Sequence, residues 1–181
     1  INPMRDREHG RIYRLSYKGG EDSKAFDFTK GNTKELIAAL KSENLFWRMT
    51  AQRLIVEQKL TDLTPELYKL VENQSMDAIG LNPAAIHALW ALHGLGVFNG
   101  ENQEAQVIIE KALAHPSAGV RKNALKVMPR SAASLQAILS SKLIQDPDLP
   151  TRKEAFLAIS EMPFSEGAAK ALLNAADVTE N

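Results

Sequence analysis

The residue types best suited to acid-base or metal chemistry in this chain are its four histidines, His9, His87, His93 and His115. His87 and His93 fall on one predicted helix, but their six-residue separation points the side chains about 240° apart. They therefore cannot bind one metal from one helix face. Each histidine is expected at the surface or at a helix end, and His115, followed by Pro116, is typical of a turn between helices.

Other residue types predict no catalytic, cofactor-binding or metal-binding residue in this chain. Gly94, Gly96 and Gly100 follow a predicted helix instead of preceding one, so they indicate helix termination and not a phosphate loop. Glu101 and Glu104 stand where a helix begins. Their negative charges offset the helix dipole there, so no role in acid-base catalysis is needed to explain them. The absence of cysteine excludes disulfides, thiolate metal sites, thiol catalysis and covalent haem attachment.

Three arginines recur at one place in the predicted second helices of the repeats, three residues before an alanine. They are Arg48, Arg121 and Arg152. A cation in the first turn opposes the helix dipole and needs an acid or a carbonyl group nearby. We expect a ladder that pairs adjacent repeats, and the alternative is that the arginines bind an anionic ligand. The candidate acids for the ladder are Glu57, Glu154 and Asp146.

The elements that carry these residues repeat along the chain. From Thr33 onward, apolar residues recur at helical spacing and the predicted helices pair into hairpins. The second helices align on Ala51, Ala88, Ala124 and Ala155, with spacings of 37, 36 and 31 residues. A repeating unit of two helices is typical of an α-solenoid, in which each hairpin covers only its neighbours. The sequence predicts an all-α fold, an α-solenoid of about four to five HEAT-like hairpins.

The stretch before the repeats has a different pattern. Tyr13, Leu15 and Tyr17 alternate at a two-residue period, which predicts one short β-strand. A polar, glycine-bearing segment follows this strand. We therefore divide the chain into a strand and linker at residues 1–28 and a helical array at residues 29–181.

Two runs of residues carry a resemblance to a known family. Residues 44–57 (NLFWRMTAQRLIVE) resemble the first HEAT repeat of secreted bacterial membrane-bound, sorbosone/glucose dehydrogenase-like proteins, and residues 88–96 (ALWALHGLG) resemble the second. Residues 9–15 are similar to the closing strand of the β-propeller in these proteins, so residues 1–28 would be a propeller remnant. The resemblance covers residues 8–96 and implies a parent protein with β-propeller, HEAT and cytochrome c modules. It also implies an extracytoplasmic location, periplasmic or secreted.

Charge and hydropathy narrow the classes of partner. The 22 basic and 22 acidic residues give a net charge of zero, which argues against nucleic acid as a partner. No apolar run reaches the roughly 18 residues that cross a bilayer, so we expect no membrane span.

The sequence favours a non-enzymatic scaffold or protein-docking module. Its partners would be proteins, first of all neighbouring domains of the same chain, and any dehydrogenase chemistry would belong to those other modules. The alternative is an accessory segment that completes the active-site cleft of a propeller-type sugar oxidoreductase. Scattered aromatic residues leave a carbohydrate-binding module as a third hypothesis, and the oligomeric state stays open.

Overall fold

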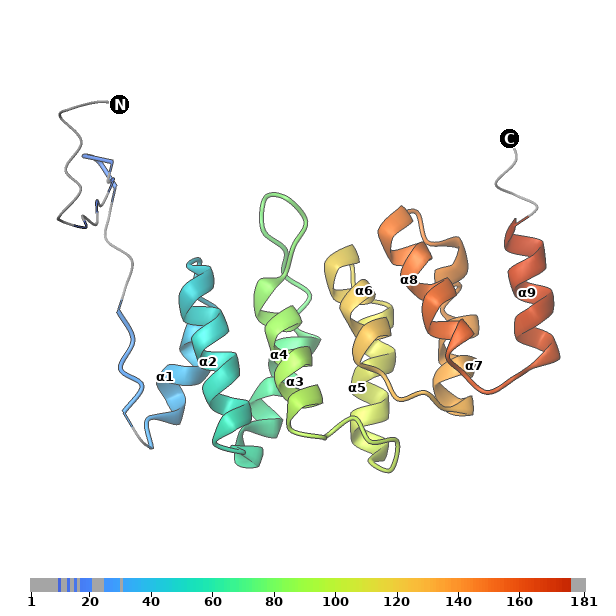
Figure 1. The fold of residues 1–181 in the computed structure, drawn as a ribbon, viewed down its shortest axis with the longest axis horizontal. Coiled ribbons are helices and arrows are strands. Elements are labelled where there is room, and N and C mark those ends of the chain that lie inside the picture. The colour runs from blue at the N-terminus through green and yellow to red at the C-terminus, as the bar shows by residue number, and fades with distance from the viewer. Residues whose placement is uncertain are drawn as a thin grey trace.

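The computed structural model describes residues 10, 13, 15, 17–20, 25–29 and 31–176. This part of the chain contains nine α-helices, two short 3-10 helices and no strand (Figure 1), so the predicted all-α class is confirmed for it. The elements are α1 (Thr33–Ala39), α2 (Leu45–Glu57), η1 (Thr61–Leu63), α3 (Thr64–Glu72), α4 (Pro83–Gly94), α5 (Gln103–Leu113), α6 (Ala118–Val127), α7 (Ala132–Ser140), η2 (Leu143–Gln145), α8 (Leu149–Ser160) and α9 (Glu166–Ala176).

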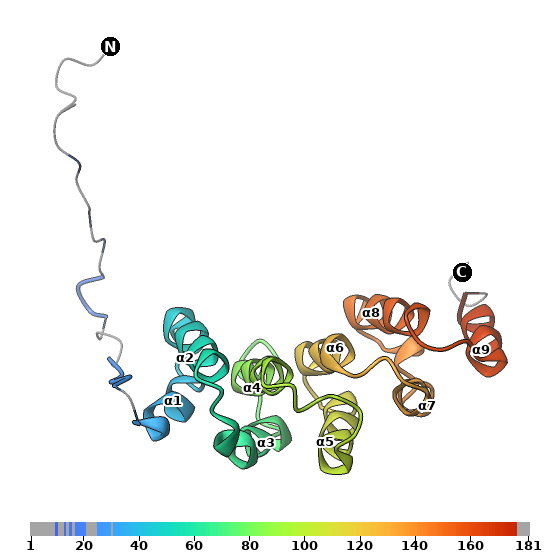
Figure 2. The same ribbon diagram turned by 60° about the horizontal axis from the view of Figure 1, so that its bottom comes forward.

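The helices lie in two rows along the long axis of the molecule, with α1 and α9 at opposite ends (Figure 2). One row contains α2, α4, α6 and α8, and each of these helices contacts the next. The other row contains α3, α5 and α7. Further contacts join α1 to α2, α3 to α4, α5 to α6 and α7 to α8, and these pairs are the first, second, third and fourth hairpins. Within the described residues, each helix is too short or too polar to cross a bilayer.

Polar capping residues determine where the helices begin. The side chain of Asn82 accepts a hydrogen bond from the backbone N–H of Ala85 at 3.0 Å, and Pro83 is the first residue of α4. A side-chain oxygen at this position satisfies a backbone donor that has no partner inside the helix. Equivalent capping bonds are made by Asn44 of α2, Asn102 of α5, Ser131 of α7 and Asp148 of α8.

Small residues lie at the centre of the contacts between second helices. The four alanines of the predicted column are completely buried, each with 0% relative exposure. Alanine at such a position allows two helix axes to approach closely, because no larger side chain holds them apart. These residues are Ala51, Ala88, Ala124 and Ala155.

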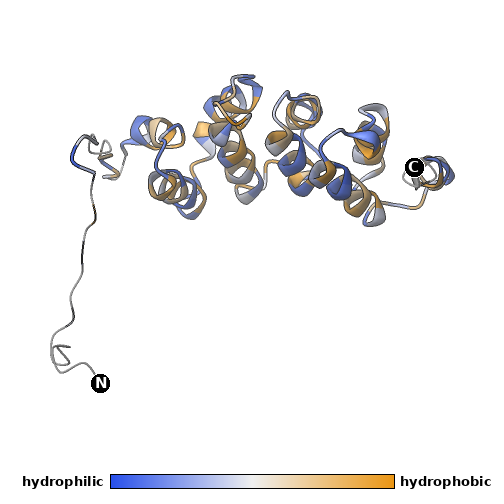
Figure 3. Ribbon diagram, turned by 90° about the horizontal axis from the view of Figure 1, so that it is seen from above, coloured by the Kyte–Doolittle hydropathy of each residue, from blue (hydrophilic) through white to orange (hydrophobic). Residues whose placement is uncertain are grey.

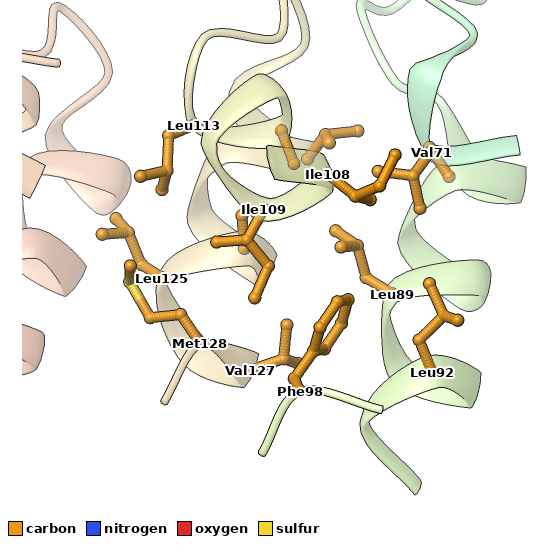
Figure 4. Close-up of a cluster of buried hydrophobic side chains, with 14 of the residues drawn as sticks. Val71, Leu89, Leu92, Phe98, Ile108, Ile109, Leu113, Leu125, Val127 and Met128 are labelled. Carbon is orange, nitrogen blue, oxygen red and sulfur yellow. The ribbon is translucent and has the colours of Figure 1, made fainter. Parts of the chain in front are cut away.

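Larger apolar side chains fill the space between the rows. Leu89 and Leu92 of α4, Ile109 of α5 and Val127 of α6 are buried at one hairpin boundary, where Leu89 extends toward Ile109 (Figure 4). Phe98, from the turn after α4, closes the same cluster. The helices carry both apolar and polar residues (Figure 3), as expected when one helix face is covered by neighbours and another meets solvent.

Gly94 marks the closest approach of α4 to α2. A Cβ atom at Gly94 would lie 2.6 Å from Cγ2 and 2.9 Å from Cγ1 of Val56. These distances are well inside van der Waals contact, so glycine at this position permits the observed spacing of the two helices.

The third and fourth hairpins are joined unequally on their two sides. In one row, α6 contacts α8 directly. In the other row, an open hollow of about 490 Å³ lies between α5 and α7. Glu110 and Leu113 line it from α5, and Gln136 and Ser140 line it from α7.

The predicted N-terminal strand is not seen at the positions that the structure describes. Tyr13, Leu15 and Tyr17 are exposed and none lies in a strand. The other residues of the predicted strand, Arg11, Ile12, Arg14 and Ser16, lie outside the described residues.

Residues 25–29, which include the predicted boundary at residue 28, pack beside the first hairpin. The rings of Phe26 and Phe28 stack with a centroid separation of 6.2 Å, and each meets Trp47 edge-on at 5.6 Å. Trp47 is half-buried beneath them. This linker segment therefore covers part of α2.

Candidate functional site

The arginine column forms a recurring contact between three of the second helices, α2, α6 and α8, and the turn before each of them. Arg48 of α2 donates from Nη1 to the backbone carbonyl groups of Ser42 (2.6 Å) and Glu43 (2.7 Å). A guanidinium group here supplies charge-assisted hydrogen bonds to two carbonyl oxygens of the turn between α1 and α2. The arginine thus holds its own hairpin closed.

Arg121 makes the same local contact and adds a second one. Its Nη1 donates to the carbonyl groups of His115 (2.8 Å) and Pro116 (2.9 Å). Its Nε and Nη2 donate to the two carboxylate oxygens of Asp146, at 2.8 and 2.9 Å. Asp146 lies in the turn before α8, so this two-bond pair joins the third hairpin to the fourth. The Asp146 backbone carbonyl also accepts a bond of 3.0 Å from Nε of Arg152.

Of the three acids that the sequence suggests as partners, Asp146 contacts the arginine column. Glu57 lies 3.7 Å from Arg53 on its own helix, where both side chains are more than half exposed. Glu154 lies 3.7 Å from Lys126. The exposed pair of Glu57 contributes little to stability. The pair of Glu154 with Lys126 joins α8 to α6, but it lies outside the arginine column.

Arg48 differs from Arg121 because its Nε has no acceptor. Nε of Arg48 is buried and makes no hydrogen bond within the part of the chain that the structure describes. The residue lines a pocket of about 680 Å³ between the α1–α2 turn and residues 73–82, which join α3 to α4. Lys41 lines the same pocket, so two cationic side chains border it.

Two acids, Glu43 and Asp77, also line this pocket, and Asp77 is occupied by its own loop. Asp77 lines the pocket, but its Oδ1 accepts hydrogen bonds from the backbone N–H groups of Ile79 (3.0 Å) and Leu81 (2.8 Å). Sequence analysis did not identify this pocket. The signal that could have revealed it is the length of residues 73–82, which exceeds that of the turns inside the other hairpins.

The second hairpin has Ala85 in the arginine column and closes its turn with other donors. The carbonyl group of Asn73, just after α3, accepts from Nδ2 of Asn82 (2.7 Å) and from Nε2 of His115 (2.9 Å). Nδ1 of His115 accepts from the backbone N–H of Ser117 at 2.9 Å, so the ring carries its proton on Nε2. His115 does lie at the predicted turn, but it is 2% exposed and joins two hairpins.

His87 corrects the expectation that every histidine lies at the surface or a helix end. It is 8% exposed in the middle of α4, and its Nδ1 lies 2.7 Å from Oε1 of Gln52 on α2. Burial, with a further contribution from the positive charge of Arg48, lowers the pKa of His87 from 6.5 to about 4. His93 is exposed as predicted, and His9 lies outside the described residues.

A second hollow lies on the row of second helices. It has a volume of about 560 Å³ between α2 and α4 and is lined by Met49, Val56 and Trp90 among others. Met49 is 52% exposed, and Trp90 is half-buried with its Nε1 donating to Oδ1 of Asn123 at 2.8 Å. The hydrogen bond fixes the indole ring at the edge of this groove.

The remaining candidates lie at helix termini. Gly96 has a φ of 74° just after α4, a conformation that favours glycine and ends the helix. Gly100, with a φ of 85°, lies in the loop before α5. Glu104 stands in the first turn of α5, as predicted. The described residues contain no group of three or more histidine, aspartate or glutamate side chains placed to hold a metal ion.

Two surfaces follow from this geometry: an apolar groove between α2 and α4, and a pocket beside Arg48 that two cations and two acids line. The first suits contact with an apolar partner surface. In the second, the unpaired Nε–H of Arg48 is a donor that could form a charge-assisted hydrogen bond with an anionic group. Comparison of the chain with family models, with curated proteins and with solved structures finds no match.

Proposed function

We propose that this chain is an α-solenoid of HEAT-like hairpins that works as a scaffold or protein-docking module. The observation that carries the proposal is the exposed apolar surface on the row of second helices. Each helix of this row packs against its neighbours in the array, and its outer face is left free for a partner. The exposed apolar residues of α2 and α8 on this row are Leu45, Phe46, Met49, Leu149 and Leu157.

The groove between α2 and α4 is the centre of the proposed docking surface. A partly buried aromatic ring beside exposed aliphatic side chains is the composition of many interaction hot spots. Trp90 is already held by Asn123, so binding there costs little side-chain entropy. A protein partner would cover Met49 and Phe46, whose exposure is 52% and 63%.

The proposed partner is a neighbouring module of the same protein. The resemblance of residues 8–96 to secreted dehydrogenase-like proteins supports this choice, because those proteins combine HEAT repeats with a propeller and a cytochrome domain. On this proposal the catalytic groups lie in the other modules, and the location is extracytoplasmic. The helical array holds those modules in position.

A calorimetric titration tests the proposal. The chain is titrated with the separately produced propeller and cytochrome regions that the resemblance implies. Met49→Glu places a charge in the groove and should weaken binding by about tenfold or more, since burial of an unpaired charge is costly. Val107→Glu on α5 is the matched control, because Val107 is similarly exposed (44%) but lies in the other row. Equal effects of the two substitutions, or none from Met49→Glu, would contradict the proposal.

A further inference from the structure

Two boundaries between hairpins can be compared within this one chain. In the third hairpin, Arg121 binds the turn before its own helix and the carboxylate of Asp146 from the following hairpin. In the first hairpin, Arg48 makes the first contact, and the acceptor that would make the second is missing.

The alignment of the repeats shows why the acceptor is missing. Asp146 stands nine residues before Ala155, and the residue nine before Ala88 is Ile79. Ile79 lines the pocket beside Arg48 and is 79% exposed. At the sequence position that carries the carboxylate of the later boundary, the earlier boundary therefore has an apolar side chain, and that side chain turns to solvent.

An unpaired buried N–H group costs free energy, and pairing it with a carboxylate recovers that cost. No acid in the described part of the chain forms an ion pair with Arg48, and Oδ1 of Asp77 is held by two backbone N–H groups of its own loop. Lys41, from the α1–α2 turn, lines the same pocket, and so does Glu43 of that turn. The donor left for an incoming carboxylate is therefore Arg48, whose Nε–H has no acceptor.

We propose that the pocket beside Arg48 binds a carboxylate of an acidic peptide segment, which takes the place that Asp146 takes beside Arg121. The inference rests on the proposed docking function and names the chemistry of one contact. Nε of Arg48 is covered from solvent, so the acceptor reaches it only when the pocket wall shifts. One non-helical part of that wall is the loop of residues 73–82, whose Met76 and Ile79 are exposed. Exposed apolar side chains there would pack against the bound peptide.

The test is a nuclear magnetic resonance titration of the complete chain with acetyl-Ala-Asp-Ala-amide. The peptide acetyl-Ala-Asn-Ala-amide is the neutral control, and sodium chloride keeps the ionic strength constant. The arginine Nε–H signal of Arg48 should shift toward that of Arg121, which already donates to a carboxylate, and should saturate in the millimolar range. Amide signals of residues 75–79 should move with it.

Three variants make the result decisive. Arg48→Gln should weaken peptide binding by about tenfold or more, whereas Arg53→Gln, at an exposed site on the same helix, should leave it unchanged. Ile79→Asp supplies the missing acid from within and should abolish binding even if Arg48→Gln fails to fold.

Three results would overturn the inference: no saturable shift at Arg48, full affinity in Ile79→Asp, or equal binding of free acetate. The last would indicate a site for small anions and not for a peptide. The probe peptide tests the pocket without a natural partner. Its failure to bind would therefore refute this inference but not the docking proposed for the groove at Met49.

Discussion

His87 should make the stability of the array depend on pH. The ring is 8% exposed between α2 and α4, and its pKa is lowered to about 4, first by burial and then by the charge of Arg48. In the unfolded chain the pKa returns to 6.5. The folded state therefore holds the neutral ring over a range of pH in which the unfolded state takes up a proton.

The sign and size of the effect follow from proton linkage. Below pH 6.5 the unfolded state binds more protons than the folded state, so the free energy of unfolding falls as pH is lowered toward the folded pKa of about 4. Between about pH 7.5 and about pH 5, this single group should remove about 2 kcal/mol. That is a large share of the roughly 5–15 kcal/mol that stabilises a typical domain.

Urea unfolding monitored by circular dichroism at the two pH values measures the effect. Wild type should lose about 2 kcal/mol more than His87→Gln, which has no titrating ring but keeps a group that can bond to Gln52. Hydrogen bonds from Thr151 lower the pKa of Asp148, and the stability lost there as pH falls is common to both chains and cancels.

His93→Gln, on the exposed face of the same helix, should keep the full pH dependence because it leaves His87 in place. Equal pH dependence in wild type and His87→Gln would refute the reasoning, since the buried ring would then titrate as it does in the unfolded chain.

Two further substitutions test the joints between hairpins by the same unfolding assay. Asp146→Ala leaves Arg121, whose side chain is 14% exposed, without its carboxylate and should cost about 3 kcal/mol; a loss under about 1 kcal/mol would mean that water replaces the pair. Gly94→Ala forces a Cβ to within 2.6 Å of Val56 and should cost about 1–3 kcal/mol. Adding Val56→Ala should recover part of that loss, and a purely additive double variant would show that the two residues do not clash.

Helices and their buried faces could be predicted because both depend on local spacing. Apolar residues at helical intervals place Leu36, Leu67, Ile109 and Val120 in the core, and the structure buries all four. Polar caps such as Asn82 mark helix starts for a reason contained in a few neighbouring residues.

The partners of long polar side chains could not be predicted in the same way. His87 and Gln52 are separated by 35 residues, and their contact depends on the rotation of two helices about their axes. For Arg121, the alignment reduced the candidates to a few acids, but only the path of the turn before α8 brings Asp146 within reach. The irregular course of residues 73–82 has no periodic signal at all.

From the unequal joint between the third and fourth hairpins we expect one preferred direction of bending. Because α6 touches α8 while a hollow of about 490 Å³ lies between α5 and α7, a small rotation about the α6–α8 line would compress or open that space. Such a rotation would change the curvature of the row of second helices and hence the distance from the groove at α2 and α4 to the apolar residues of α8. A partner that spans both would set the array at one curvature.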